Sequence, residues 1–164
     1  MSPQKFDLQF LLSHPAHFIA GGFGSGLSPV APGTVGTIVA MPCWLLITQS
    51  SLLWQLGIVV SAFMLGVYVS ERACKKLGTH DHGSIVWDEF VGLWVALVFV
   101  PVTWLNLLLG FVLFRFFDIV KPWPIKWLDK KVGGGLGVMI DDVVAGLFAG
   151  LCLVAIQAVQ LGQV

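Results

Sequence analysis

The sequence predicts an all-α integral membrane protein, a helical bundle of about five apolar helices preceded by a short interfacial helix. Apolar residues make up 57% of the 164 residues and charged residues only 11%, against about 25% charged in ordinary soluble domains. The mean hydropathy is +0.89, and a chain of this length cannot hide so much apolar surface in one compact globule. We therefore expect a single membrane-embedded domain over residues 1–164. A helical protein that buries this surface in an oligomer is the alternative.

The first 36 residues contain two different patterns. Residues 6–12 alternate Phe and Leu with Gln and Asp, which predicts a short amphipathic helix at the membrane interface. Residues 21–36 hold six glycines and two prolines, and this composition is typical of a loop.

Five apolar runs follow this loop. They cover residues 34–48, 52–70, 90–100, 105–117 and 143–161. The second run approaches the roughly 20 residues that cross a bilayer as a helix, and Pro42 is expected to kink the first. The third and fourth runs are short, so they either cross with helical charged flanks or form a shallow hairpin.

The distribution of charge predicts the topology. With five alternating spans and a cytoplasmic N-terminus, the inner segments are residues 1–33, 71–89 and 115–142, and they hold every basic residue of the chain. This satisfies the positive-inside rule. The acids and histidines fall on the same side, so polar chemistry is expected at the cytoplasmic face. A net charge of zero gives no argument for binding nucleic acid.

Acidic residues flank three of the expected spans. Asp88 and Glu89 precede the third run, Asp118 ends the fourth, and Asp141 and Asp142 precede the fifth. Alternating spans bring these ends to one level, where clustered carboxylates need protons or cations to offset their repulsion. Oxygen ligands favour magnesium, calcium or manganese. Helix capping is the simpler interpretation, although two adjacent acids at two helix starts exceed what a cap requires.

Basic and glycine residues beside these acids suggest an anion site. Arg115 lies three residues before Asp118 and Lys121 three after it, so both can reach a phosphate group. The alternative is that they are snorkelling cations of the inner face. The backbone amides of Gly33 and Thr34, at the start of the first run, are candidates for a phosphate cradle; a flexible membrane-entry loop explains the glycines equally.

The segment His80-Asp81-His82 could bind a metal ion through its histidines, but a solvated loop is the favoured interpretation. Cys43, Cys74 and Cys152 have neither metal-ligand nor redox spacing.

Four sequence blocks resemble the phosphatidylglycerophosphatase A family. They are APGTVG at 31–36, VWDEFVG at 86–92, FRFFDIVKPWPI at 114–125 and GGLGVMIDDVVAG at 134–146. The resemblance runs through nearly the whole chain and implies a Mg²⁺-dependent phosphatase of the bacterial inner (cytoplasmic) membrane, with several passes. It implies that the enzyme removes the terminal phosphate of phosphatidylglycerophosphate and releases phosphatidylglycerol and inorganic phosphate. The expected partners are therefore this phospholipid substrate and the surrounding membrane lipids.

The residue pattern and the resemblance together predict three sets of site residues. The expected magnesium ligands are Glu89, Asp118, Asp141 and Asp142. The expected catalytic carboxylates are Asp88, Glu89, Asp118 and Asp142. The expected phosphate-binding residues are Gly33, Thr34, Arg115 and Lys121. One carboxylate is expected to act as general base for water, and an aspartyl-phosphate on Asp118 or Asp142 is the less favoured route.

Two other classes of function fit the composition. A small ion-coupled membrane transporter could use the acidic cluster to bind a cation. A lipid-binding or scaffolding membrane protein would need no catalysis. The expected outer loops carry no charge and no charge lies inside the apolar runs, which disfavours a polar path across the bilayer.

Overall fold

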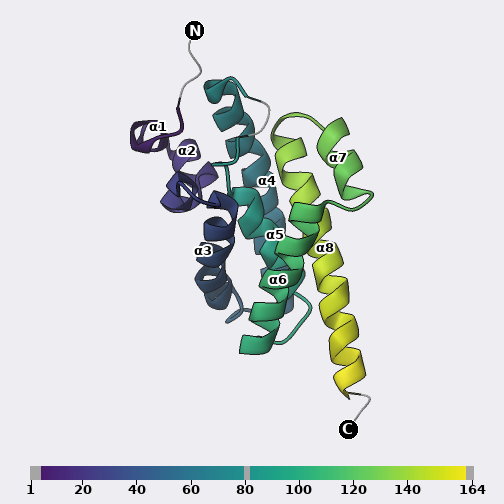
Figure 1. Cartoon of the computed structure of the whole chain (residues 1–164). Helices are drawn as coiled ribbons and strands as arrows, with labels where there is room; N and C mark the ends of the chain where they lie inside the picture. The colour runs from purple at the N-terminus through teal and green to yellow at the C-terminus, as the bar shows by residue number, and fades with distance from the viewer. Residues whose placement is uncertain (1–4, 80–81, 162–164) are drawn as a thin grey trace.

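The structure, a computed structural model, describes residues 5–79 and 82–161, and every regular element in these ranges is helical (Figure 1). The all-α prediction is confirmed for this part of the chain. The elements are α1 (Leu8–Leu12), α2 (Pro15–Ala20), the 3₁₀ helix η1 (Gly22–Leu27), α3 (Pro32–Ile47), α4 (Leu52–Leu77), α5 (Trp87–Leu97), α6 (Trp104–Val120), α7 (Ile125–Lys131) and α8 (Gly134–Leu161).

Two of the described helices, α4 and α8, are long and apolar enough to cross a membrane. The 11 residues of α5 give a helix about 16 Å long, much shorter than the roughly 30 Å hydrocarbon core. The structure therefore supports a membrane-helical protein, and the predicted count of about five spans is not confirmed.

The helix boundaries differ from the apolar runs in a systematic way. Helix α4 continues past residue 70 to Leu77, and α8 begins at Gly134 rather than near residue 143. The prediction of a loop at residues 21–36 was wrong in part, because η1 and the start of α3 lie in this range. Likewise α7 occupies the expected connection after α6. Apolar runs mark what a membrane can cover, whereas helices continue wherever backbone hydrogen bonding and packing sustain them.

Helix α5 lies at the centre of the bundle and packs against α3, α4, α6 and α8. Its side chains Phe90, Val91 and Leu93 are fully buried. Two indole N–H groups tie it to its neighbours: Trp94 donates to the Ala40 carbonyl of α3 and Trp87 to the Ala62 carbonyl of α4. These bonds satisfy buried polar groups and orient the start of α5.

Glycines allow α5 and α8 to approach each other very closely. A Cβ atom on Gly146 would lie 2.2 Å from the Gly92 carbonyl oxygen, and one on Gly92 would lie 2.9 Å from the carbonyl oxygen of Asp142. Both contacts are too short for any side chain. The crossing therefore holds the Asp142 segment of α8 directly against α5.

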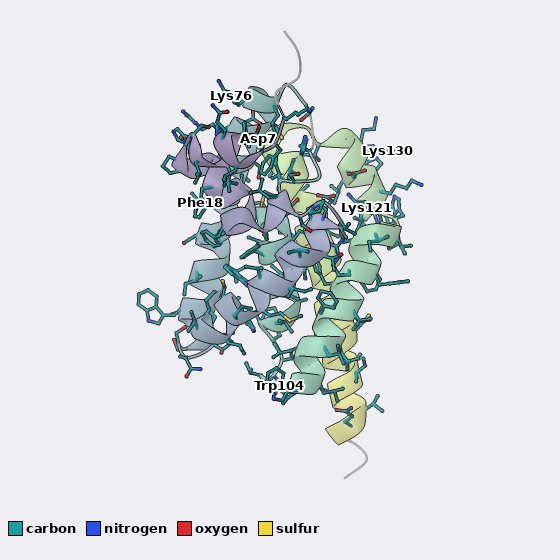
Figure 2. The ribbon with its side chains drawn as sticks, turned by 60° about the vertical axis from the view of Figure 1, so that its left-hand side comes forward. Asp7, Phe18, Lys76, Trp104, Lys121 and Lys130 are labelled. Atoms are coloured by element: carbon teal, nitrogen blue, oxygen red, sulfur yellow. The ribbon has the colours of Figure 1, made fainter. Side chains whose placement is uncertain are left out.

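Charged side chains gather toward one end of the bundle. Figure 2 shows Lys76, Lys121 and Lys130 toward the end where the N-terminal segment lies, and Trp104 toward the opposite end. The predicted N-terminal helix is present as α1, with Leu8 and Leu12 exposed.

We predict that Gly146→Ala destabilises the bundle by about 1–3 kcal/mol, the usual cost of overpacking a core. The added methyl group would collide with the backbone of α5 rather than with a movable side chain. Thermal unfolding of the detergent-purified protein measures this effect.

Gly57→Ala is the matched control, because this exposed helical glycine has nothing within 4 Å of a Cβ atom. Its unfolding temperature should stay the same or rise. Equal unfolding temperatures for the two variants would contradict the close crossing of α5 and α8.

Candidate active site

A cavity of about 310 Å³ lies where the start of α3, the start of α5, the end of α6 and the first turns of α8 meet. It is lined by Ala31, Pro32, Gly33, Gly83, Ile85, Asp88, Glu89, Arg115, Asp118, Lys121, Val138, Asp141 and Asp142. All five acids expected at the span ends line this one cavity, as do both expected cations. Among these lining residues, carboxyl groups outnumber cationic side chains five to two.

Arg115 joins two of these carboxylates. Its guanidinium forms an ion pair with Asp118 at 2.8 Å, one helical turn further along α6, and a second with Glu89 of α5. Glu89 is buried, and its Oε2 also accepts a hydrogen bond from the Thr37 hydroxyl at 3.1 Å. A buried carboxylate persists only when such partners compensate its lost hydration.

Lys121, the second cation of the cavity, forms ion pairs with acids of α7 and α8. It is the C-cap of α6 in a left-handed conformation, with φ 45° and ψ 60°, and this turn directs the chain from α6 toward α7. Its ammonium binds Asp129 of α7 at 2.9 Å and Asp141 of α8. Burial opposes charge on Lys121, but the hydrogen bonds to Asp141 and Asp129 outweigh it and raise its pKa, so the ammonium stays charged.

Asp141 and Asp142 lie inside α8, seven and eight residues after its first residue. The capping interpretation is therefore wrong for both. Both are buried, and one oxygen of each, Oδ1 of Asp141 and Oδ2 of Asp142, is buried without a hydrogen-bond partner. Asp88 is also no N-cap, since that position of α5 is Val86. Buried unpaired carboxylate oxygens are rare in folded proteins and indicate a proton or a missing ligand.

Gly33 lines the cavity at the start of α3. Its neighbours leave no room for a side chain at this position. A Cβ atom there would lie 2.0 Å from Glu89 Oε1 and 3.3 Å from Arg115 Nη1. Thr34, the other expected phosphate-binding residue, is not among the residues that line the cavity. The start of α3 thus lies at the cavity, and the absence of a side chain at Gly33 lets Glu89 and Arg115 approach its backbone closely.

The arrangement of acids differs from a preformed metal centre. Across residues 5–79 and 82–161, no group of three or more His, Cys, Asp or Glu side chains is placed so that it could hold a metal ion as it stands. Glu89 and Asp118 are engaged by Arg115, and Asp141 by Lys121. The donor chemistry nevertheless fits a hard divalent cation, because Asp141 and Asp142 both line this cavity and each has a carboxylate oxygen without a hydrogen-bond partner.

Two residues of this network were not expected from the sequence. Thr37 follows Gly33 by one turn of α3, and its hydroxyl bonds both the Gly33 carbonyl and Glu89; helical spacing is the signal that could have found it. Asp129 binds Lys121 only because α7 folds back, which no local pattern indicates. His80 and Asp81 of the expected trio lie outside the described residues, and His82 does not line the cavity.

Comparison with known proteins shows the family of the chain. The family described as phosphatidylglycerophosphatase A matches residues 18–157. The chain belongs to the phosphatidylglycerophosphatase A family. A relative named phosphatidylglycerophosphatase A from Escherichia coli (strain K12) is 50% identical over 141 residues, 84% of this chain and 81% of the relative. Another of that name from Haemophilus influenzae (strain ATCC 51907 / DSM 11121 / KW20 / Rd) is 44% identical over 153 residues, 89% and 91% of the two chains.

No solved structure matches the chain. Every residue lining the cavity lies within the span matched by the phosphatidylglycerophosphatase A family. The resemblance inferred from the four sequence blocks is confirmed, and the protein is a phosphatase of this family.

We predict that Gly33→Ala lowers phosphatase activity by up to about 100-fold, the effect of displacing a reacting group by roughly 1 Å. The methyl group would push the Glu89 carboxylate away from Arg115. Steady-state kinetics of the purified variant measure the loss.

Gly83→Ala is the control, because Gly83 lines the same cavity with nothing within 4 Å of a Cβ atom. It should retain activity near that of the wild-type protein. An unimpaired Gly33→Ala enzyme would show that the position of Glu89 is unimportant.

Proposed function

We propose that the protein is a Mg²⁺-dependent lipid phosphatase that hydrolyses phosphatidylglycerophosphate to phosphatidylglycerol and phosphate. The observation that carries this proposal is the cavity that two cations and five carboxylates line together. Membership of the phosphatidylglycerophosphatase A family supports the substrate, since the relatives bear that name.

We further propose that the bundle crosses the bacterial inner membrane several times with this cavity facing the cytoplasm. The positive-inside rule supports this orientation, because the expected inner segments carry all the basic residues. The apolar exterior, with Trp104 and Leu151 exposed at 85% and 68%, suits contact with lipid. The acyl chains of the substrate would stay in the bilayer while its terminal phosphate enters the cavity.

The magnesium site is proposed from the donor set of the cavity. Asp141 supplies its unpartnered Oδ1, and Glu89, Asp118 and the other carboxylate oxygen of Asp142, Oδ1, are the further ligands expected from the sequence. A bound divalent cation offsets charge on the phosphoryl oxygens and lowers the pKa of a water molecule beside it.

The residues of the chain supply the other parts of the reaction. Arg115 and Lys121 donate hydrogen bonds to the phosphoryl oxygens, whose charge they stabilise as the phosphoryl group is transferred. Asp142, buried with an unpartnered Oδ2, accepts the proton of the attacking water as general base. The water oxygen forms the new bond to phosphorus, the bond from phosphorus to the glycerol oxygen breaks, and that oxygen takes the proton that Asp142 accepted.

The distribution of charge disfavours the transporter alternative. No charged residue occurs in residues 34–70, 90–114 or 143–161. An ion path across a bilayer needs polar groups along its length, so the acidic cavity fits surface chemistry at one membrane face better than translocation.

We predict that the detergent-purified protein releases inorganic phosphate from phosphatidylglycerophosphate in mixed micelles. Asp142→Asn and Asp118→Asn should each lower this rate by about 10²–10⁴-fold. The first removes the proposed general base, and the second removes a carboxylate that pairs with Arg115. Parallel assays with phosphatidic acid define headgroup specificity.

Asp7→Asn is the control for the loss of an acid. Asp7 caps α1 far along the chain from the cavity residues, and Asn is an equally good cap. Unfolding temperatures establish that all three variants are folded. Full activity in both cavity variants would contradict the assignment of these carboxylates.

We predict that EDTA abolishes phosphate release and that added Mg²⁺ restores it. The cavity carries more carboxylates than cations, so an anionic phosphate should bind poorly until a divalent cation offsets that charge. Undiminished activity in EDTA after dialysis would exclude the magnesium requirement while leaving the phosphatase proposal intact.

A further inference from the structure

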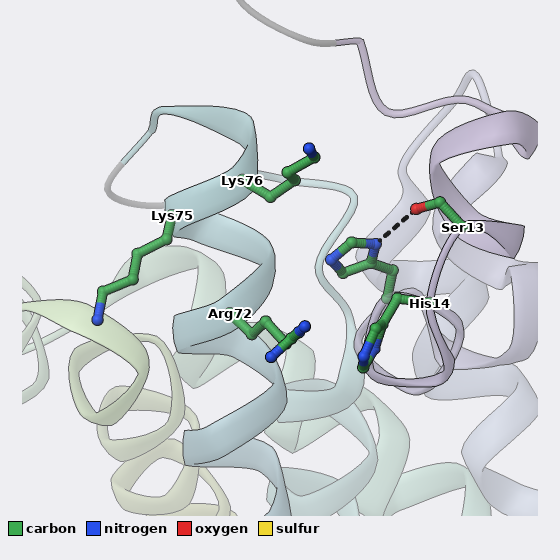
Figure 3. Close-up of a pocket in the computed structure, with 6 residues that line it drawn as sticks. Ser13, His14, Arg72, Lys75 and Lys76 are labelled. Carbon is green, nitrogen blue, oxygen red and sulfur yellow. Dashed lines mark hydrogen bonds between the residues drawn. The ribbon is translucent and has the colours of Figure 1, made fainter.

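A second cavity, of about 460 Å³, lies where the N-terminal helices meet the end of α4 (Figure 3). It is lined by Ser13, His14, His17, Arg72, Lys75 and Lys76. It shares no residue with the acidic cavity and contains no carboxylate among its lining residues. No step of the proposed hydrolysis uses it, yet three cations and two imidazoles are among its lining residues.

Hydrogen bonds determine which nitrogen of each imidazole can donate. The Ala16 amide donates to Nδ1 of His14, so the proton of neutral His14 must be on Nε2. The Ser13 hydroxyl donates to the Phe10 carbonyl, so Nδ1–H of His17 is the donor toward Ser13 Oγ at 2.9 Å. His14 Nε2 is therefore a donor in either charge state, and His17 Nε2 becomes one when protonated.

The three cations of this cavity differ in whether they form an ion pair. Arg72 and Lys76 have no ion-pair partner among the described residues, whereas Lys75 binds Glu71 at 2.9 Å. In Figure 3, Arg72 extends toward His14 and Lys75 is turned the opposite way. Arg72 and Lys76 are thus the two cations available to an anion, and Lys75 offers a matched comparison on the same helix.

We propose that this basic cavity binds a phosphate-bearing anion, either free inorganic phosphate or the headgroup of an anionic phospholipid. The guanidinium of Arg72 matches a phosphate group as a bidentate donor, and Lys76 adds a point charge. His14 contributes an N–H donor, Nε2, from the opposite wall. Exposed Leu8 and Leu12 on α1 place an apolar surface on the N-terminal segment, as expected of an element that touches lipid.

The buried His17, only 4% exposed, reports on occupancy of the cavity. Burial lowers its pKa, and the charges of His14, Arg72 and Lys76 lower it further, against the hydrogen bond with the Phe10 carbonyl. A bound anion would offset those positive charges and favour the imidazolium. Occupancy should therefore raise the pKa of His17.

The test is an NMR titration of the full-length protein in detergent with ¹⁵N-labelled histidine rings. Inorganic phosphate is added in one series and a short-chain phosphatidylglycerol below its micelle concentration in the other, both at constant ionic strength. No histidine lines the acidic cavity, so the imidazole signals of His14 and His17 report on the basic cavity alone. We expect saturable shifts of these signals and a higher pKa for His17.

The variant Arg72→Gln/Lys76→Gln should weaken this binding by about tenfold or more, since it removes both cations that can form charge-assisted hydrogen bonds to the anion. Both residues are exposed, so the variant is expected to fold, which its unfolding temperature verifies. Lys75→Gln removes the same charge from the same helix and should bind as the wild-type protein does.

Saturation by phosphate alone would assign the site to the free ion, and saturation by the lipid alone to a headgroup; either result supports the proposal. It is overturned if neither ligand saturates the imidazole shifts. It is equally overturned if the double variant binds like the wild-type protein, or if Lys75→Gln loses binding as severely as the double variant.

Discussion

The position of the Arg115 guanidinium is the constraint on which the acidic cavity depends. It lies between Glu89 and Asp118, two carboxylates on different helices that would otherwise repel each other in a poorly hydrated place. Breaking a buried ion pair leaves an uncompensated charge, which usually costs more than the pair contributes. The ion pair between Arg115 and Glu89 therefore holds the end of α6 against the start of α5.

Close helix packing makes that electrostatic arrangement possible. Gly146 and Gly92 bring α8 against α5, and Gly33 brings the start of α3 against Glu89. A side chain at any of these positions would push the helices apart, and water would then enter the enlarged cavity. Because water would hydrate the carboxylates, it would also weaken the interactions through which Arg115 and Lys121 act on a phosphoryl group.

The two polar cavities of the bundle have opposite charge. The cavity between α3, α5, α6 and α8 is rich in carboxylates, whereas the one beside α1, α2 and α4 is lined by cations and imidazoles. An anionic lipid is repelled by the first until a cation offsets its charge, and attracted by the second without any metal. The proposed hydrolysis and the proposed anion site therefore rest on separate physical requirements, and one can fail without the other.

Composition, charge distribution and four motif blocks were enough to predict a helical membrane protein, its family and the polar residues of the acidic cavity. Such properties depend on the chemistry of each residue and its spacing along the chain. Helix lengths, and with them the number of spans, depended on the fold, because flanks outside the apolar runs, such as residues 134–142 at the start of α8, are helical only where tertiary packing sustains them. The positions of Asp141 and Asp142 within α8, the contact of Asp129 with Lys121 and the basic cavity around Arg72 were likewise decided by tertiary packing. The basic cavity joins residues 13–17 to residues 72–76, and Asp129 meets Lys121 only through the turn between α6 and α7; no local pattern encodes which groups such folding will bring together.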